Sequence, residues 1–286
     1  HRGAQVVRIK DADTFFEIVR RHVESIEEFS RPHPLSIDAA VSSLKRYLTE
    51  PKYRIQLSDL VDEAVDRAVE ATSSDRFPPQ GGAAPTGESA TARVRGYESA
   101  CATLLAMAPI GGLWAEESHY SVWQRALERL SATTGGGGYT LWLNLQRYPG
   151  TLLLYGLGLG AVEGGKLQFL GRMLATPIYR ENREDIPAVQ LLPPFCLFEQ
   201  GGDTARILEG MDRRYAPLND WLHSVLRSST KRLIPNDDRY TLVFDKLEML
   251  MSLGYAHHAK RTKDWYWAPP GAWGYRRQNL ERFLAE

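Results

Sequence analysis

Apolar residues recur three or four positions apart along most of the chain, which is the spacing of one face of an α-helix. Such stripes run through 37–48, 58–68, 97–108, 118–130, 218–226 and 237–251. The first stripe begins after Ser36 and ends before Pro51, and Ser58 is the expected cap of the second. The pattern predicts a mainly α fold in the form of a multi-helix bundle.

The most apolar part of the chain, Thr151–Thr176, is also rich in glycine. Its uncharged run from Thr151 to Val162 is too short to cross a bilayer, which takes roughly 20 residues. Glycines at 156, 158 and 160 weaken a helix unless a neighbouring backbone approaches closely. Gly164 and Gly165 are typical of a helix end, after which helical spacing resumes. We expect a helix–turn–helix hairpin at the core of the bundle.

Three segments depart from the helical pattern. Gln5–Ile9 reads as a short strand that a helix follows, which indicates the terminal strand–helix remnant of an α/β domain. Tyr139–Leu145 fits either a strand or the start of a helix. Ile186–Phe198 contains three prolines and predicts an extended connection.

These patterns predict three regions. Residues 1–72 form the end of an upstream α/β domain plus connecting helices. Residues 73–95, rich in Pro, Gly, Ser, Thr and Ala, form a flexible linker. Residues 96–286 form a helical regulatory or assembly domain. Because the chain begins at His1 without an initiator methionine, we expect it to be a fragment with a folded part upstream.

The charge balance indicates which partners the chain can attract, and the cysteine content indicates its redox compartment. Lys and Arg number 35, as do Asp and Glu, so no global field attracts nucleic acid or an anionic membrane. The two cysteines, Cys101 and Cys196, lack metal-type spacing and suit a reducing cytoplasm. No signal peptide or spanning segment is visible, so we expect a cytoplasmic protein without a membrane partner.

No candidate catalytic or metal motif is complete. Gly160, Gly165 and Lys166 match G-x-x-x-x-G-K, but Leu167 stands where a phosphate-binding loop needs Ser or Thr. The cluster Glu116, Glu117 and His119 lacks the H-E-x-x-H spacing that places two imidazoles on one helix face. We therefore assign no catalytic, cofactor-binding or metal-binding residue.

The C-terminal tail interleaves basic and aromatic residues, a combination that suits single-stranded nucleic acid. The candidate partner-binding residues are Lys260, Arg261, Lys263, Trp265, Trp267 and Trp273. The alternative is an extended segment that packs its tryptophans against the bundle, which the neighbouring prolines and the balanced charge favour.

Three groups of segments together resemble a known family. They are GAQVVRIKDADTFF at Gly3–Phe16 with Arg31–Val61, then LLLYGLGLGAVEGGKLQFLGRML at Leu152–Leu174, then DRYTLVFDKLEMLMSLGYA at Asp238–Ala256 with WAPPGAWGYRR at Trp267–Arg277. They resemble the region downstream of the sirtuin-like domain in bacterial sirtuin-like proteins of anti-phage defence. The resemblance covers about half of the chain and consists of packing patterns.

The resemblance implies a function for the chain and names its partners. The upstream sirtuin-like domain would use NAD, whereas this chain would carry no cofactor and no catalytic residue. The chain would be a helical regulatory, sensing or oligomerisation region of an NAD-consuming defence effector. Its implied partners are the upstream domain, further copies of itself, and a phage or other protein trigger. The alternative function is a nucleic-acid-binding module that uses the tail.

Overall fold

The computed structural model describes residues 16, 20, 36–80, 84–133, 137–179, 184–197, 203–259, 271 and 273. The chain divides into two compact units, His1–Ala39 and Ala40–Glu286. In the first unit, Phe16 and Arg20 are helical. The predicted strand Gln5–Ile9 lies outside the described residues, so the α/β remnant stays a prediction.

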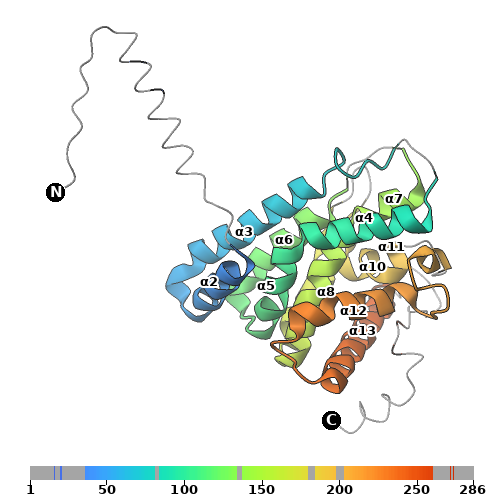
Figure 1. The fold of residues 1–286 in the computed structure, drawn as a ribbon. Coiled ribbons are helices and arrows are strands. Elements are labelled where there is room, and N and C mark those ends of the chain that lie inside the picture. The colour runs from blue at the N-terminus through green and yellow to red at the C-terminus, as the bar shows by residue number, and fades with distance from the viewer. Residues whose placement is uncertain are drawn as a thin grey trace. The chain divides into compact units, whose positions relative to one another are not determined.

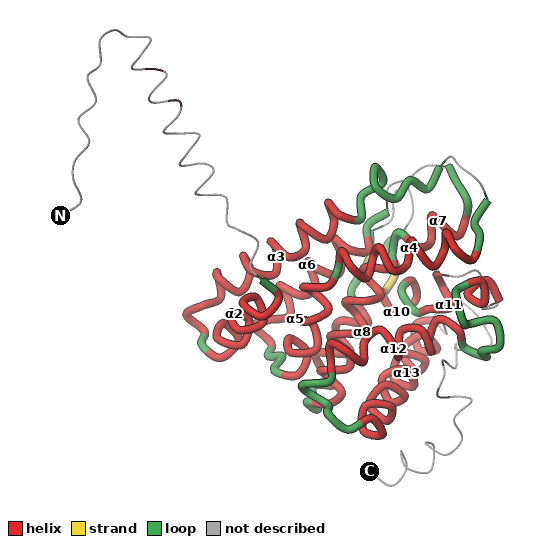
Figure 2. The backbone as a smooth tube through the Cα atoms, in the orientation of Figure 1, coloured by secondary structure: helices red, strands yellow, loops and turns green. Residues whose placement is uncertain are grey.

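Most of the described residues from Ser36 onward lie in helices (Figures 1 and 2). The α-helices are α2 (Ile37–Thr49), α3 (Arg54–Ala71), α4 (Gly87–Ala100), α5 (Ala102–Leu113), α6 (Tyr120–Ser131), α7 (Thr140–Leu145), α8 (Tyr148–Glu163), α9 (Leu167–Ala175), α10 (Ala188–Leu191), α11 (Pro194–Leu197), α12 (Pro217–Thr230) and α13 (Asp237–Ala259). Short 3₁₀ helices are η1 (Pro51–Tyr53), η2 (Glu117–His119) and η3 (Asp203–Ile207). The expected mainly α bundle is confirmed.

The strands of the described residues form one small antiparallel pair. β1 (Pro177–Ile178) pairs with β2 (Ile186–Pro187), and Ile178 lies opposite Ile186. Figure 2 shows this pair as a minor feature among helices. Among the described residues, no helix combines the length and the apolar character that crossing a membrane requires.

Helix α8 is the centre of the core, and α5 is its closest neighbour (Figure 1). Every residue of α8 from Tyr148 to Ala161 is buried, which explains why the segment carries no charge. A Cβ atom added at Gly160 would overlap the backbone carbonyl oxygen of Pro109 in α5. A Cβ atom added at Gly112 of α5 would likewise overlap the carbonyl oxygen of Leu157. The glycines therefore let the two helix backbones approach closely, as predicted.

The turn between α8 and α9 has the hydrogen bonds of a Schellman motif. Gly165 adopts the left-handed conformation at φ +66°, and its N–H donates to the carbonyl of Val162 over 3.2 Å. The Lys166 N–H donates to the carbonyl of Ala161 over 2.7 Å. The predicted hairpin is confirmed. A helix, and not a strand, precedes the G-x-x-x-x-G-K sequence, as the rejection of a phosphate-binding loop required.

The expected cap at Ser58 is wrong, and the predicted linker is wrong for its later part. Helix α3 begins at Arg54, directly after the 3₁₀ turn at Pro51, and Ser58 lies inside it with its hydroxyl donating to Asp62. The predicted linker 73–95 is helical from Gly87 onward, because Thr86 and Ser89 form a capping box at the start of α4.

Two ambiguous or extended segments are helical. Tyr139–Leu145 resolves to helix α7, with Tyr139 as its N-cap. The prediction that Ile186–Phe198 is extended is wrong where the segment forms α10 and α11, two short helices of four residues each. Pro194 occupies the first position of α11, where a missing N–H costs no hydrogen bond.

Candidate functional site

The tail residues predicted to bind a partner are described at one position only. Lys260, Arg261, Lys263, Trp265 and Trp267 lie outside the described residues. Trp273 is half-buried, and its indole nitrogen is buried without a hydrogen-bond partner among the described residues. The predicted binding site on the tail stays a prediction, and Trp273 presents less surface to a partner than a fully exposed ring would.

A buried carboxylate holds the described part of this tail. Glu248 lies on α13 and is 2% exposed. Its Oε1 accepts a hydrogen bond from the Asn219 side chain of α12, and its Oε2 accepts the Trp273 backbone N–H over 3.4 Å. We call this group of residues, together with Gly271, the glutamate latch. The latch connects two helices and the C-terminal segment through one side chain.

Gly271 completes the latch and is required there for two reasons. Its backbone has φ +59°, a conformation that L side chains rarely adopt. A Cβ atom at this position would also lie 2.7 Å from Oε2 of Glu248. The backbone of the tail therefore passes directly over the carboxylate.

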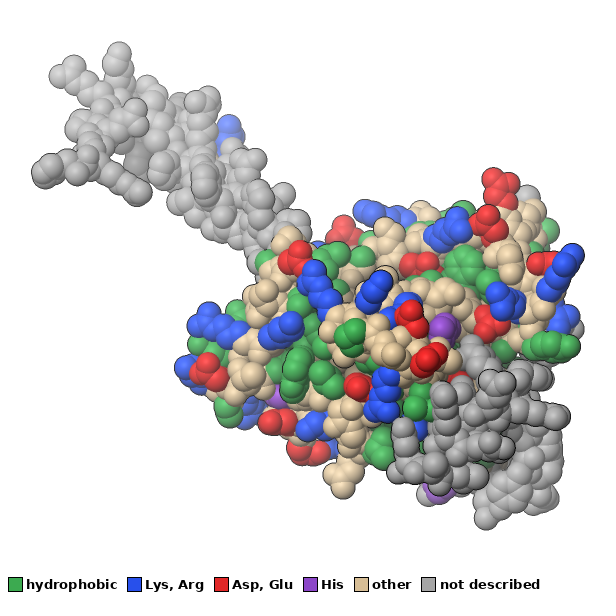
Figure 3. All heavy atoms as spheres, turned by 60° about the horizontal axis from the view of Figure 1, so that its bottom comes forward, with side chains coloured by type: hydrophobic (Ala, Val, Ile, Leu, Met, Phe, Trp, Pro, Cys, Tyr) green, Lys and Arg blue, Asp and Glu red, His purple; other side chains and the backbone are tan. Residues whose placement is uncertain are grey.

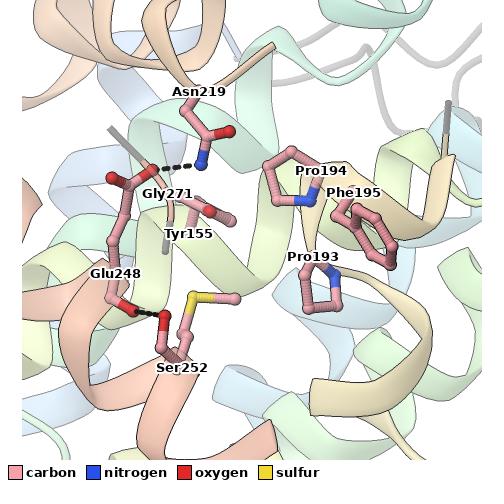
Figure 4. A pocket seen from close by; sticks show the side chains of 9 residues that line it. Tyr155, Pro193, Pro194, Phe195, Asn219, Glu248, Ser252 and Gly271 are labelled. Carbon is pink, nitrogen blue, oxygen red and sulfur yellow. Dashed lines mark hydrogen bonds between the residues drawn. The ribbon is translucent and has the colours of Figure 1, made fainter. Parts of the chain in front are cut away.

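The glutamate latch lines a small pocket with apolar walls (Figure 4). Tyr155, Pro193, Pro194, Phe195 and Met251 form these walls, and Ser252 donates its hydroxyl to the Glu248 backbone carbonyl over 2.9 Å. The pocket volume is about 30 Å³, space for about one or two water molecules. Burial and the nearby Glu248 charge raise the pKa of Tyr155 well above its ordinary value. The pocket is suited to fixing the tail and is too small for an organic substrate.

Sequence reasoning missed Glu248, although a signal was present. Asp245, Glu248 and Ser252 are three and four positions apart on α13, and all three are buried. A polar stripe at helical spacing within an otherwise apolar helix indicates buried hydrogen-bonding groups. The identities of Asn219 and Trp273 as partners required the tertiary structure.

A second carboxylate braces a different set of helices. Glu98 of α4 accepts hydrogen bonds on Oε1 from Tyr148 of α8 over 2.8 Å and from Trp221 of α12 over 2.6 Å. Burial raises the pKa of Glu98, and the two hydrogen bonds and the Arg95 charge oppose that rise. The carboxylate is therefore used for packing three helices together.

Both thiols are poorly suited to nucleophilic chemistry. Burial raises the pKa of Cys101 to about 12 and that of Cys196 to about 12. Because the thiolate is the reactive form, neither side chain is activated at neutral pH. The prediction that they are small buried residues agrees with the burial of Cys101, whereas Cys196 is half-buried and donates to the Gln190 carbonyl.

The structure brings together two motifs that are far apart in sequence. Glu116, which precedes η2, and Glu117, its first residue, line one hollow with Lys166 and Phe169 at the start of α9. The hollow has a volume of about 370 Å³ and is the larger of the two hollows described here. We call it the turn hollow. His119 follows Glu117 by two positions and is buried, and this burial lowers the pKa of its imidazole.

Within the described ranges, no three His, Cys, Asp or Glu residues are grouped so that they could hold a metal ion.

The face drawn in Figure 3 carries basic and acidic side chains interspersed, consistent with the equal numbers of the two charges in the sequence. No protein-family model, curated protein or solved structure matches the chain.

Proposed function

We propose that the chain is a helical regulatory, sensing or oligomerisation region of a bacterial NAD-consuming defence protein and that it is not catalytic in itself. The proposal joins the family resemblance of the packing segments to the way the described polar groups are used. NAD consumption would belong to an upstream sirtuin-like domain, and this chain would control that domain or assemble it.

The glutamate latch is the observation that carries the proposal. One buried carboxylate links α13, α12 and the backbone at Trp273, so a change at any of the three alters the hydrogen bonds of the others. A buried polar group that is hydrogen-bonded favours one arrangement, and its rearrangement is costly because it leaves partners unpaired. Such a group is suited to coupling a surface segment to the helical core.

The test compares NAD consumption in the natural protein that carries both regions. Removal of residues 36–286 takes away α2 and every later helix as whole elements, whereas a boundary at residue 95 would cut α4. We expect the deletion to change NAD consumption or the molecular mass of the assembly, measured by chromatography of the nucleotides and by light scattering. The 286-residue chain alone is expected to consume no NAD.

Point variants separate regulation from gross loss of structure. We expect Glu248→Gln to change the trigger dependence of NAD consumption or the assembly state, because it alters the latch while keeping the side-chain shape. Glu70→Gln, on the exposed surface of α3, is the matched control. Equal NAD consumption and equal assembly in the deletion, the latch variant and the natural protein would refute the proposal.

A further inference from the structure

The turn hollow has the size of a small-molecule site. Its volume of about 370 Å³ falls in the lower part of the range of roughly 300–1,000 Å³ that ligand pockets occupy. One part of the lining comes from Ala115–Glu117, which are two residues of the connection after α5 and the first residue of η2. A second part of the lining comes from Gly165–Phe169, the Schellman turn and the first turn of α9.

Part of the charge in the turn hollow is already neutralised. The Arg172 guanidinium lies 3.7 Å from the centre of the Tyr120 ring and forms an ion pair with Glu117. The Tyr120 hydroxyl contacts the Thr176 hydroxyl over 3.3 Å, which fixes the ring. These stacked and paired side chains give the hollow a preformed wall without net charge.

Two charged side chains, one from each of these lining segments, stay outside this pairing. Within the part of the chain that the structure describes, the side chains of Glu116 and Lys166 have neither a hydrogen bond nor an ion pair. Glu116 is exposed and Lys166 is half-buried. A ligand in the hollow therefore meets a carboxylate from one lining segment and an ammonium group from the other.

The wall that carries Lys166 also favours a negative group by its backbone. Lys166, the N-cap residue of α9, makes no side-chain capping hydrogen bond, so the first-turn N–H groups keep the partial positive charge of a helix N-terminus. The same wall presents Leu167, which is 54% exposed, and Phe169, which is nearly buried. Apolar contact is thus available next to the positive wall.

We propose that the turn hollow binds a small zwitterion with an apolar body, such as a hydrophobic amino acid or a short peptide. The ligand carboxylate faces Lys166 and the start of α9, the ligand ammonium group faces Glu116, and the apolar body packs on Leu167 and Phe169. This assignment rests on the hollow alone and does not depend on a regulatory role or on NAD.

The test measures direct binding to the full chain by titration calorimetry and ligand-observed NMR. The zwitterionic probes are leucine, phenylalanine, glycyl-leucine and 6-aminohexanoate, which differ in the separation of their charges. Hexanoate and hexylamine each carry one of the two charges. We expect at least one zwitterion to bind about tenfold or more tightly than both single-charge compounds, since hydrogen bonds to charged groups contribute about 1.5–3 kcal/mol.

Variants assign the two charges to the two walls. Lys166→Gln is expected to weaken the zwitterion and hexanoate but to leave hexylamine unchanged, whereas Glu116→Gln is expected to show the reverse selectivity. Lys231→Gln and Glu70→Gln, both at exposed positions elsewhere, are the controls and should leave binding unchanged. Circular dichroism verifies that all variants are folded.

Two results would overturn the assignment. One is the absence of binding by every zwitterion at millimolar concentration. The other is binding that neither Lys166→Gln nor Glu116→Gln weakens, since the binding site would then lie elsewhere on the chain. Neither result bears on NAD consumption, so the failure of this site and that of the proposed regulatory function are distinguishable.

Discussion

Gly160 of α8 faces the backbone carbonyl oxygen of Pro109 in α5 so closely that no Cβ atom fits between them. We therefore expect Gly160→Ala to lower the free energy of unfolding by about 1–3 kcal/mol or more, because a methyl group forces the packed backbones apart. Chemical denaturation monitored by circular dichroism measures the change.

Gly171 in α9 provides the matched control for that substitution. It is an exposed helical glycine with open space where its Cβ would be. Gly171→Ala should raise the free energy of unfolding by up to about 1 kcal/mol, since alanine favours the helix. Equal effects at the two positions would contradict the close packing of α5 and α8.

The glutamate latch predicts protection of one backbone amide. The Trp273 N–H donates to Glu248, so we expect Glu248→Gln to speed its exchange with solvent, because one carboxylate oxygen is replaced by an amide group. Hydrogen exchange measured by NMR reports on this amide directly. The control Glu70→Gln should leave the exchange rate unchanged. If Glu248→Gln also leaves it unchanged, contacts other than the Glu248 carboxylate hold the tail.

Gly271→Ala tests the same latch from the opposite side. The added methyl group would meet Glu248 Oε2, and the backbone conformation at φ +59° disfavours alanine. We expect this variant to speed exchange at Trp273, because the methyl group displaces the tail backbone from the carboxylate. An unchanged exchange rate would show that the tail backbone does not pass over the carboxylate as described.

Glu98 predicts a specific pH dependence of stability. Its pKa is raised in the folded chain, so the folded state holds the proton more tightly than the unfolded state does. The stabilising contribution is therefore fully present below the unfolded value of about 4.3 and is lost as pH rises through the folded pKa. Relative to the natural chain, Glu98→Gln should become more stable as the pH rises.

The measurement is the free energy of unfolding of both chains at several pH values between about 4 and 8. Glutamine retains an oxygen that can accept from Tyr148 and Trp221, because both hydrogen bonds reach the same atom of Glu98. The difference between the two chains then reports on ionisation. A difference that does not vary with pH would contradict the raised pKa.

The two thiols should react with a thiol reagent only slowly in the folded chain at pH 8. Each has a pKa of about 12, so little thiolate is present, and Cys101 is also inaccessible. We expect two equivalents to react after unfolding in denaturant and one in Cys196→Ser. A fast native phase that Cys196→Ser removes would show that Cys196 is activated.

Periodicity predicted the hairpin α8–α9 well because its signals are local. The spacing of glycine and apolar residues defines α8. Gly165 follows its end in the left-handed conformation, which glycine adopts readily. Helix α4 was missed since its first turn consists of small residues and its capping box uses Ser89 where Glu or Gln is usual. Its composition resembles a linker, although Ala90 and Thr91 are buried.

The polar contacts of the core could not be predicted because their partners are distant in sequence. Glu98 and Trp221 are 123 positions apart, and Asn219 and Glu248 are 29 apart. The turn hollow could not be predicted for the same reason, because its lining residues are distant in sequence. Glu116 and Lys166 each belong to an incomplete motif, and only the packing of the chain brings them into the lining of one hollow.

The complete burial of α8 has a consequence for how the protein is made. Leu247 of α13 occupies the space beside Gly158, so α8 leaves the ribosome long before the helix that covers that side. Until α13 has been synthesised, part of an uncharged helix stays exposed to water, where such surfaces favour aggregation. Chaperone dependence during synthesis should therefore be greatest between the appearance of α8 and that of α13.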